Sequence, residues 1–312
     1  MLLLTGMRII INRIKMTYSD RGLNMGSLFG DTNLDLKARI LEIARNAPEA
    51  TVEAEEPLPE KNVQANGKVK VLMCPYDVGI QPTEFGRSGL FKLLPKTERR
   101  LVKNQFVECR SDIQLFFTGE ELNVQDETVW MAILRLCRGK PLGERIFFTL
   151  AQLLGELKMR DSGGKTGSRS QVIKRLERLS IAHIKIELTR KDNKSVITTG
   201  LLKFGIEDET GKMYVRLDPD GAILFENLAY QNWETRLSLK SDISVRLLDY
   251  VCGHQSGKPH AQKLEYLRQW FGYAGRPDKF RAAAMAGLEE LEAAGVISEV
   301  GSNKTTLRWI RI

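Results

Sequence analysis

Two helices, a turn, a third helix and a β-hairpin are predicted to follow one another in the middle of this chain. Apolar residues at helical spacing predict helices at residues 126–138, 148–157 and 168–180. Runs rich in β-branched residues predict strands at residues 182–188 and 195–199, joined by a charged turn. This order is typical of a winged helix-turn-helix domain, in which the third helix enters the major groove of DNA.

The same order recurs near the C-terminus. Helices are predicted at residues 243–251, 261–271 and 280–294, followed by strands at residues 296–300 and 305–310. Residue identity between the two copies is slight, so the repeat is one of element order and not of sequence. We therefore expect an α+β fold with two tandem winged-helix (helix-turn-helix plus β-hairpin wing) domains.

The rest of the sequence sets the expected domain limits. Residues 1–66 are predicted to be a poorly ordered N-terminal tail that ends in an acidic linker carrying Pro57 and Pro59. Residues 67–220 are assigned to the first winged-helix domain, and residues 221–312 to the second. Further elements are expected in the first domain: a strand at residues 68–74, a short helix at 83–94, and hairpins at 105–117 and 201–217.

The third helix of the first copy is strongly basic. Residues 158–191 contain ten Lys or Arg and three acids, a local balance of +7 in a chain whose formal net charge is +8. Val172, Ile173, Leu176 and Leu179 are expected on the buried side of this helix, and Ser168 is expected to be its N-cap. The opposite side is basic and carries a Gln, which suits a DNA groove, although a solvated helix face would look the same.

Thirteen residues are candidate DNA contacts. Base-edge contacts are predicted from the two third helices: Arg169, Gln171, Lys174, Arg175 and Arg178 in the first copy, and Arg276, Lys279 and Arg281 in the second. Phosphate contacts are predicted for Lys165, Arg190, Lys191, Lys194 and Lys304.

Signals for catalysis are weak. Gly164-Lys165-Thr166 looks like the end of a P-loop, but position 159 is Met where that motif needs Gly. Only three histidines and four widely spaced cysteines occur, without a metal-ligand or disulfide pattern, so a reducing cytoplasm is expected. With a pI of about 9.3, a polyanionic partner is expected, nucleic acid before membrane. We expect a DNA-binding protein that is not an enzyme and needs no cofactor or metal.

The sequence resembles the TrfA family of plasmid replication initiators. The similarity extends over roughly residues 80–312, in strings that include RSGLF at 87–91, FTG at 117–119, PLGE at 141–144 and LLKF at 201–204. The resemblance implies a protein that binds direct repeats (iterons) at a plasmid origin and promotes opening of an adjacent AT-rich segment, which adds single-stranded DNA to its partners. It also implies recruitment of the host initiator, replicative helicase and sliding clamp, and self-association as a dimer in copy-number control.

Two alternatives stay open at this point. Met25, Ser27, Leu28 and Phe29 form a candidate clamp-binding peptide in which Met stands where the usual peptide has Gln, or they are tail sequence without that role. A transcriptional repressor with two winged-helix modules and no initiator activity would have the same composition and element order.

Overall fold

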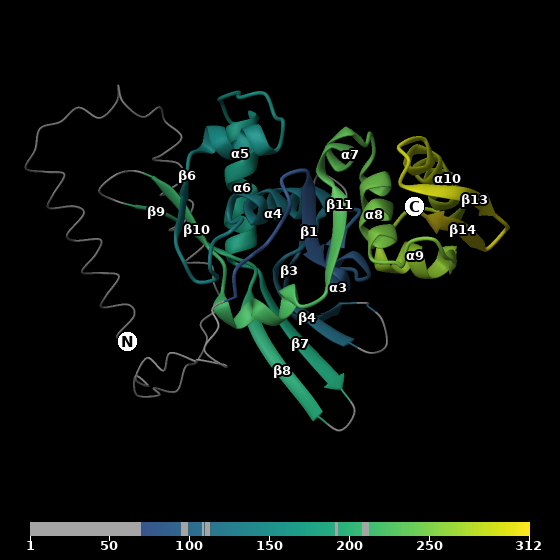
Figure 1. The fold of residues 1–312 in the computed structure, drawn as a ribbon, viewed down its shortest axis with the longest axis horizontal. Coiled ribbons are helices and arrows are strands. Elements are labelled where there is room, and N and C mark those ends of the chain that lie inside the picture. The colour runs from purple at the N-terminus through teal and green to yellow at the C-terminus, as the bar shows by residue number, and fades with distance from the viewer. Residues whose placement is uncertain (1–69, 95–98, 108, 110–112, 191–192, 208–211) are drawn as a thin grey trace, which may run out of the picture. The chain divides into compact units, whose positions relative to one another are not determined.

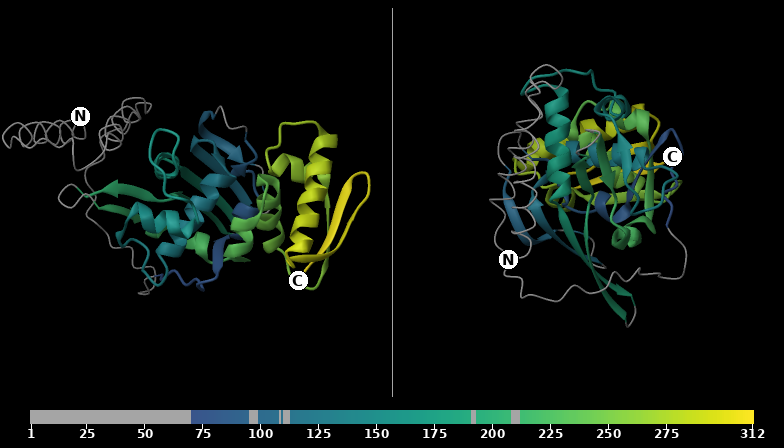
Figure 2. Two further views of the ribbon diagram at one scale, coloured as in Figure 1. Left: turned by 90° about the horizontal axis from the view of Figure 1, so that it is seen from above. Right: turned by 90° about the vertical axis from the view of Figure 1, so that its left-hand side faces the viewer.

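The computed structural model describes residues 70–94, 99–107, 109, 113–190, 193–207 and 212–312. These residues all belong to one compact unit, Asn62–Ile312. The predicted tail and linker, residues 1–66, lie outside the described residues. Helices and strands are mixed throughout the unit, as Figures 1 and 2 show, so the broad α+β expectation is met.

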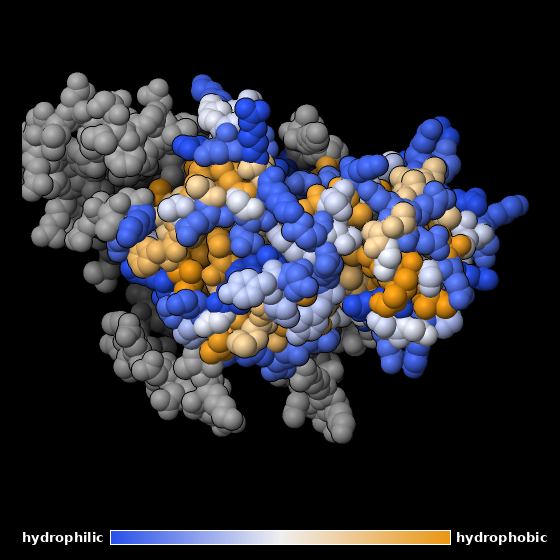
Figure 3. Space-filling view, turned by 45° about the horizontal axis from the view of Figure 1, so that its top comes forward, coloured by the Kyte–Doolittle hydropathy of each residue, from blue (hydrophilic) through white to orange (hydrophobic). Residues whose placement is uncertain are grey.

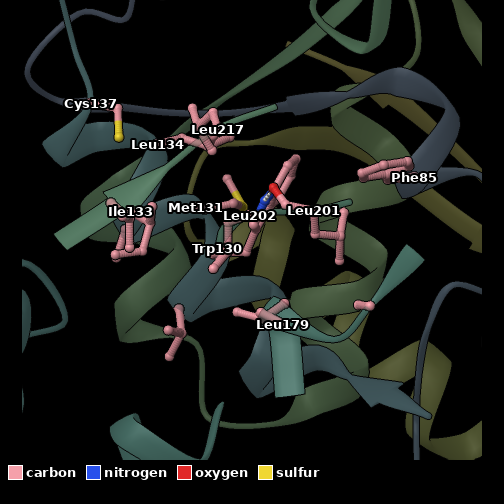
Figure 4. Packing of buried hydrophobic residues seen from close by; sticks show 14 of the residues in the cluster. Phe85, Trp130, Met131, Ile133, Leu134, Cys137, Leu179, Leu201, Leu202 and Leu217 are labelled. Atoms are coloured by element: carbon pink, nitrogen blue, oxygen red, sulfur yellow. Dashed lines mark hydrogen bonds between the residues drawn. The ribbon is translucent and has the colours of Figure 1, made fainter. Parts of the chain in front are cut away.

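The first core is built around helix α4 (Val124–Leu136). Asn123 begins this helix, because its side chain accepts hydrogen bonds from two first-turn amides while the Asp126 carboxylate accepts one from the Asn123 amide. Trp130, Ile133 and Leu134 are almost fully buried. Figure 4 shows Trp130 beside Leu201 and Leu202, and its indole Nε1 donates a hydrogen bond to the Leu201 carbonyl at 3.3 Å.

The predicted element order follows α4. Helices α5 (Leu150–Glu156) and α6 (Ser168–Ser180) precede strands β7 (His183–Arg190) and β8 (Asn193–Gly200). This hairpin does not stand alone: β3 (Leu101–Val107) and β4 (Ile113–Glu120) join it in an antiparallel sheet of order β3-β4-β7-β8. The hairpin predicted at residues 105–117 therefore becomes part of the same sheet as the expected wing.

A second sheet of the first half has the order β6-β10-β9. Its strands are β6 (Ile146–Phe148), β9 (Lys203–Ile206) and β10 (Met213–Arg216). Strand β6 was not predicted, and it includes Phe148, which was expected to be the first residue of a helix. Met213 of β10 lies opposite Phe148, so the strand forms because a partner 65 positions later supplies its hydrogen bonds.

The prediction was wrong in two places near the start of the described chain. Of the strand expected at residues 68–74, the structure describes residues 70–74, and these form one isolated bridge between Val71 and Pro141, because their backbone pairs with a turn and not with a strand. The helix expected at residues 83–94 is only α3 (Thr83–Gly86), followed by β2 (Phe91–Lys92), which pairs in parallel with β5 (Leu122–Asn123).

The second half repeats the order around its own core. It comprises α8 (Asp242–Cys252), β12 (Pro259–Lys263), α9 (Leu264–Trp270), α10 (Pro277–Ala293), β13 (Ile297–Ser302) and β14 (Thr306–Arg311). The sheet order is β12-β14-β13, and α10 packs against β13 (Figure 2). The helix predicted at residues 261–271 starts later, since residues up to Lys263 pair with β14.

The connection between the halves contributes to both cores. It contains η2 (Pro219–Phe225), β11 (Leu228–Asn232), which pairs with β1 (Val78–Pro82), and α7 (Trp233–Ser238). Phe225 and Trp233 belong to the first core, whereas Ala229 belongs to the second. The first core thus extends beyond residue 220, where a boundary was expected.

Candidate nucleic-acid interface

The turn before α6 is folded onto the start of that helix. The Ser168 hydroxyl donates to the Arg160 carbonyl at 2.7 Å, and the Ser168 amide donates to the Ser162 hydroxyl at 2.9 Å. Gly167, and not Ser168 as predicted, is the N-cap. A β-carbon at Gly167 would lie 2.2 Å from the Gly163 carbonyl oxygen, so only glycine fits where the turn closes on the helix.

Three predicted contacts gather at this end of α6. Lys165 is exposed at the tip of the turn. Arg169 binds Asp161 through two hydrogen bonds of 2.6 and 2.7 Å, and these bonds lower the pKa of Asp161. Gln171 is exposed, and its side-chain amide donates to the Thr166 carbonyl at 2.7 Å. The fold therefore presents two cations and an amide together, held by contacts that a bound DNA could exchange.

Arg178 occupies a different environment from the other α6 candidates. Its side chain is 13% exposed and binds Glu120 at 2.8 Å and Asp126 at 2.6 Å, and Asp126 is fully buried. This pair joins α6 to the first turn of α4 and to the end of β4. The guanidinium of Arg178 therefore holds α6 against α4 and β4. A contact between Arg178 and a base would require those bonds to break.

Lys174 and Arg175 are half-buried on α6. Burial lowers the pKa of Arg175, and the negative charges of Asp126 and Asp242 act in the opposite direction. Asp242 begins α8, so Arg175 faces charges from both halves of the unit. On the buried side of α6, Val172, Leu176 and Leu179 are fully enclosed, while Ile173 is half-buried.

In the second half, basic residues surround the start of α10. Arg276 is the N-cap and binds Asp278 through hydrogen bonds of 3.0 and 2.9 Å. Lys279 and Arg281 are exposed on the first turns, and Lys304 is exposed on the turn between β13 and β14. The structure brings Arg281 and Lys304 to one groove of about 1040 Å³, whereas Arg276 and Lys279 do not line it.

Two cations of this groove were missed from the sequence, Lys263 and Arg268. Lys263 was assigned to a helix, but it ends β12, and its place follows from the Lys263–Thr306 pairing. A strand made of polar residues leaves no apolar alternation to detect, so the sequence held no signal for this rim of the groove.

The remaining candidates are less fully described. The β7–β8 pairing runs to Arg190 and Asn193, so both strands are longer than predicted, and Figure 1 shows them side by side. Arg190 and Lys194 are placed by their backbone, and Lys191 lies outside the described residues. The candidate clamp peptide, Met25, Ser27, Leu28 and Phe29, also lies outside them.

The part of the chain that the structure describes contains no group of three or more His, Cys, Asp or Glu able to hold a metal ion. None of its helices is long and apolar enough to cross a bilayer. On the face shown in Figure 3, hydrophilic side chains surround several apolar patches.

Comparisons with known proteins identify the family. The plasmid replication initiator protein TrfA of Escherichia coli is 26% identical over 231 residues, which are 71% of this chain and 59% of that protein. Two crystal structures of domains 2 and 3 of RctB have TM-scores of 0.49 and 0.44. They are 12% and 11% identical, covering 74% and 71% of this chain and 98% and 95% of theirs. The family model described as TrfA protein matches residues 69–309, so this chain belongs to the TrfA family.

Proposed function

We propose that this chain is a plasmid replication initiator that binds direct repeats at its origin through two winged-helix modules. The observation that carries the proposal is the second half: α8, β12, α9 and α10 precede a hairpin, the sheet order is β12-β14-β13, and exposed cations surround the start of α10. This is the element order of a winged helix, in which the third helix enters the major groove. Family membership supports the same role.

The first half departs from this arrangement. Strand β6, which lies between α4 and α5, pairs with β10 and not with the β7–β8 hairpin. The hairpin is widened by β3 and β4. We propose that α6 nevertheless acts as the recognition helix of this module, because the Lys165, Arg169 and Gln171 side chains gather at its exposed N-terminal end.

Affinity and specificity would come from different residues. Lys165, Lys304 and the β7–β8 hairpin tip would contact phosphates, which release counterions on binding. Arg169, Gln171 and Lys174 would contact base edges in one major groove, and Arg281 would do so in the next, about one helical turn away. If about six phosphates are neutralised, log K falls with log salt at a slope near −5.

Initiation would follow from binding without catalysis. We propose that the protein hydrolyses no nucleotide and that the binding and bending of repeat DNA favour opening of the adjacent AT-rich segment. The host initiator, the replicative helicase and the sliding clamp would then be recruited. Dimers would be the stored form that limits copy number. These roles are carried over from the family. The chain matches 59% of the length of the Escherichia coli TrfA protein.

Footprinting on the replicon's own origin tests the proposal. We expect DNase I protection that repeats with the period of the direct repeats and extends into no other region. Protection confined to a single operator beside a promoter would favour the repressor alternative and contradict the initiator role. Absence of any protected segment would contradict DNA binding altogether.

A further inference from the structure

The groove beside α10 differs in chemistry from the exposed surface of α6. Residues Lys263, Leu264 and Glu265 at the start of α9, the first half of α10, and the β13–β14 turn enclose about 1040 Å³. Its lining combines apolar residues of α10 with four cations: Lys263, Arg268, Arg281 and Lys304. Two acids also line it, Glu265 and Asp278, and the Asp278 carboxylate is held by Arg276. With four cations against two acids, the lining is net positive.

Apolar side chains face this groove from the helix. Ala282 is exposed and Met285 is half-buried, and both line the groove together with Arg281. Residues three apart lie on one side of a helix, so Ala282 and Met285 both present apolar groups to the groove, and Met285 also packs against the second core. By contrast, the candidate contacts of α6 are Arg169, Gln171 and Lys174, all of which are polar.

Thymine is the base that such a surface suits. In the major groove its C5-methyl is the apolar group presented by an A·T pair, and apolar side chains recognise it by contact. The unbranched Met285 side chain adapts to irregular apolar shapes. Lys304 and Lys263, which lie at the rim, would meet the phosphates on either side.

We propose that the second module recognises thymine C5-methyl groups through Ala282 and Met285, whereas the first module reads polar base edges. This inference rests on the proposed function, because it assumes that α10 lies in a major groove of the repeat. If the inference holds, the thymines whose methyl groups contribute most to binding lie in the half-site that the second module covers.

Uracil substitution tests the inference on the unmodified protein. Each thymine of one origin repeat is replaced in turn by deoxyuridine, which lacks only the methyl group, and binding is measured by fluorescence anisotropy. We expect one or two positions in the half-site of the second module to weaken binding about three- to fivefold, the effect of losing one buried methyl. Equal affinity at every position, with binding of the thymine repeat intact, would overturn the inference. Failure to bind the thymine repeat would instead overturn the proposed function.

A variant then links the methyl group to the side chain. Met285→Ala should weaken binding to the thymine repeat to a similar extent and lose the response to uracil at the sensitive position. The exposed Met73, in the first half, supplies a control for the loss of a methionine away from the groove: Met73→Ala should keep both the affinity and the uracil response. Thermal unfolding confirms that each variant is folded. A Met285→Ala protein with the wild-type uracil response would contradict the role of this side chain.

Discussion

The Glu127 carboxyl of α4 and the Arg246 guanidinium of α8 are in contact and fully buried, with Oε2 and Nη1 3.3 Å apart. Arg236 of α7 approaches the same carboxylate at 3.6 Å and binds Asp249, which also lies 3.4 Å from Arg246. Gln231 donates to Asp249 at 3.0 Å. Since α4 belongs to the first half and α8 to the second, this polar cluster holds the two modules in one arrangement.

The cluster predicts a pH dependence of stability. Burial, together with the nearby charge of Asp249, raises the pKa of Glu127 to about 8, against 4.5 for the unperturbed group. Folding therefore takes up a proton between these values, so the free energy of unfolding should fall as pH rises from about 5 to 8. Glu127→Gln, which is neutral at every pH, should flatten this slope in denaturant titrations. Identical slopes in the two proteins would contradict the assignment.

At Glu121 we expect the opposite dependence of stability on pH, so this residue serves as a comparison for Glu127. Burial alone would raise its pKa, but hydrogen bonds from Arg100 and Lys92 outweigh burial and hold the pKa at about 2. The stability that this carboxylate contributes is present above pH 4.5 and is lost as pH falls toward 2. Glu121→Gln should lower the free energy of unfolding at pH 7 by at least about 1 kcal/mol and reduce the loss in acid. An unchanged acid limb in the variant would argue against this role.

Arg178→Ala should act on stability before binding. Its removal takes one of the cations from the fully buried Asp126, so the free energy of unfolding should fall by about 2–4 kcal/mol. Chemical denaturation measures this change. A fully stable Arg178→Ala protein with weakened DNA binding would instead indicate that Arg178 contacts a base, as predicted from the sequence.

Lys174→Ala should weaken DNA binding and leave stability nearly unchanged. Lys174 is half-buried on α6, and the loss of one base or phosphate contact should weaken repeat binding about tenfold, with unfolding changed by less than about 0.5 kcal/mol. Electrophoretic mobility shifts on one repeat provide the measurement. Unchanged affinity would remove the middle of α6 from the interface.

Lys279→Ala tests whether Lys279, predicted from the sequence as a base contact, contacts a phosphate instead, since it does not line the groove beside α10. Lys279 is exposed at the start of α10, so its removal should weaken binding to all sequences alike and reduce the salt slope by about 1. Lys140 is equally exposed at the turn after α4 and supplies the control. A salt slope that Lys279→Ala leaves at its wild-type value would place this residue away from the DNA.

Much of the helical framework could be predicted from the sequence, because α4, α6, α8 and α10 are long enough to show their apolar period. Short strands could not. β1 and β11 pair although they lie about 150 positions apart, and no local pattern predicts that pairing. β12 is polar, so it lacks the apolar alternation by which a strand is recognised. Burial of single charges was equally hidden. Arg178 is distinguished from Arg169 only by Asp126 and Glu120, which lie 52 and 58 positions away in sequence.

Hydroxyl-radical footprinting of a single origin repeat tests most directly the central claim that two helices of one unit read adjacent major grooves. Wild-type protein should protect two patches about one helical turn apart. Lys279→Ala combined with Arg281→Ala should weaken one patch and keep the other. A single protected patch in the wild type, or equal loss of both patches in the variant, would contradict the account.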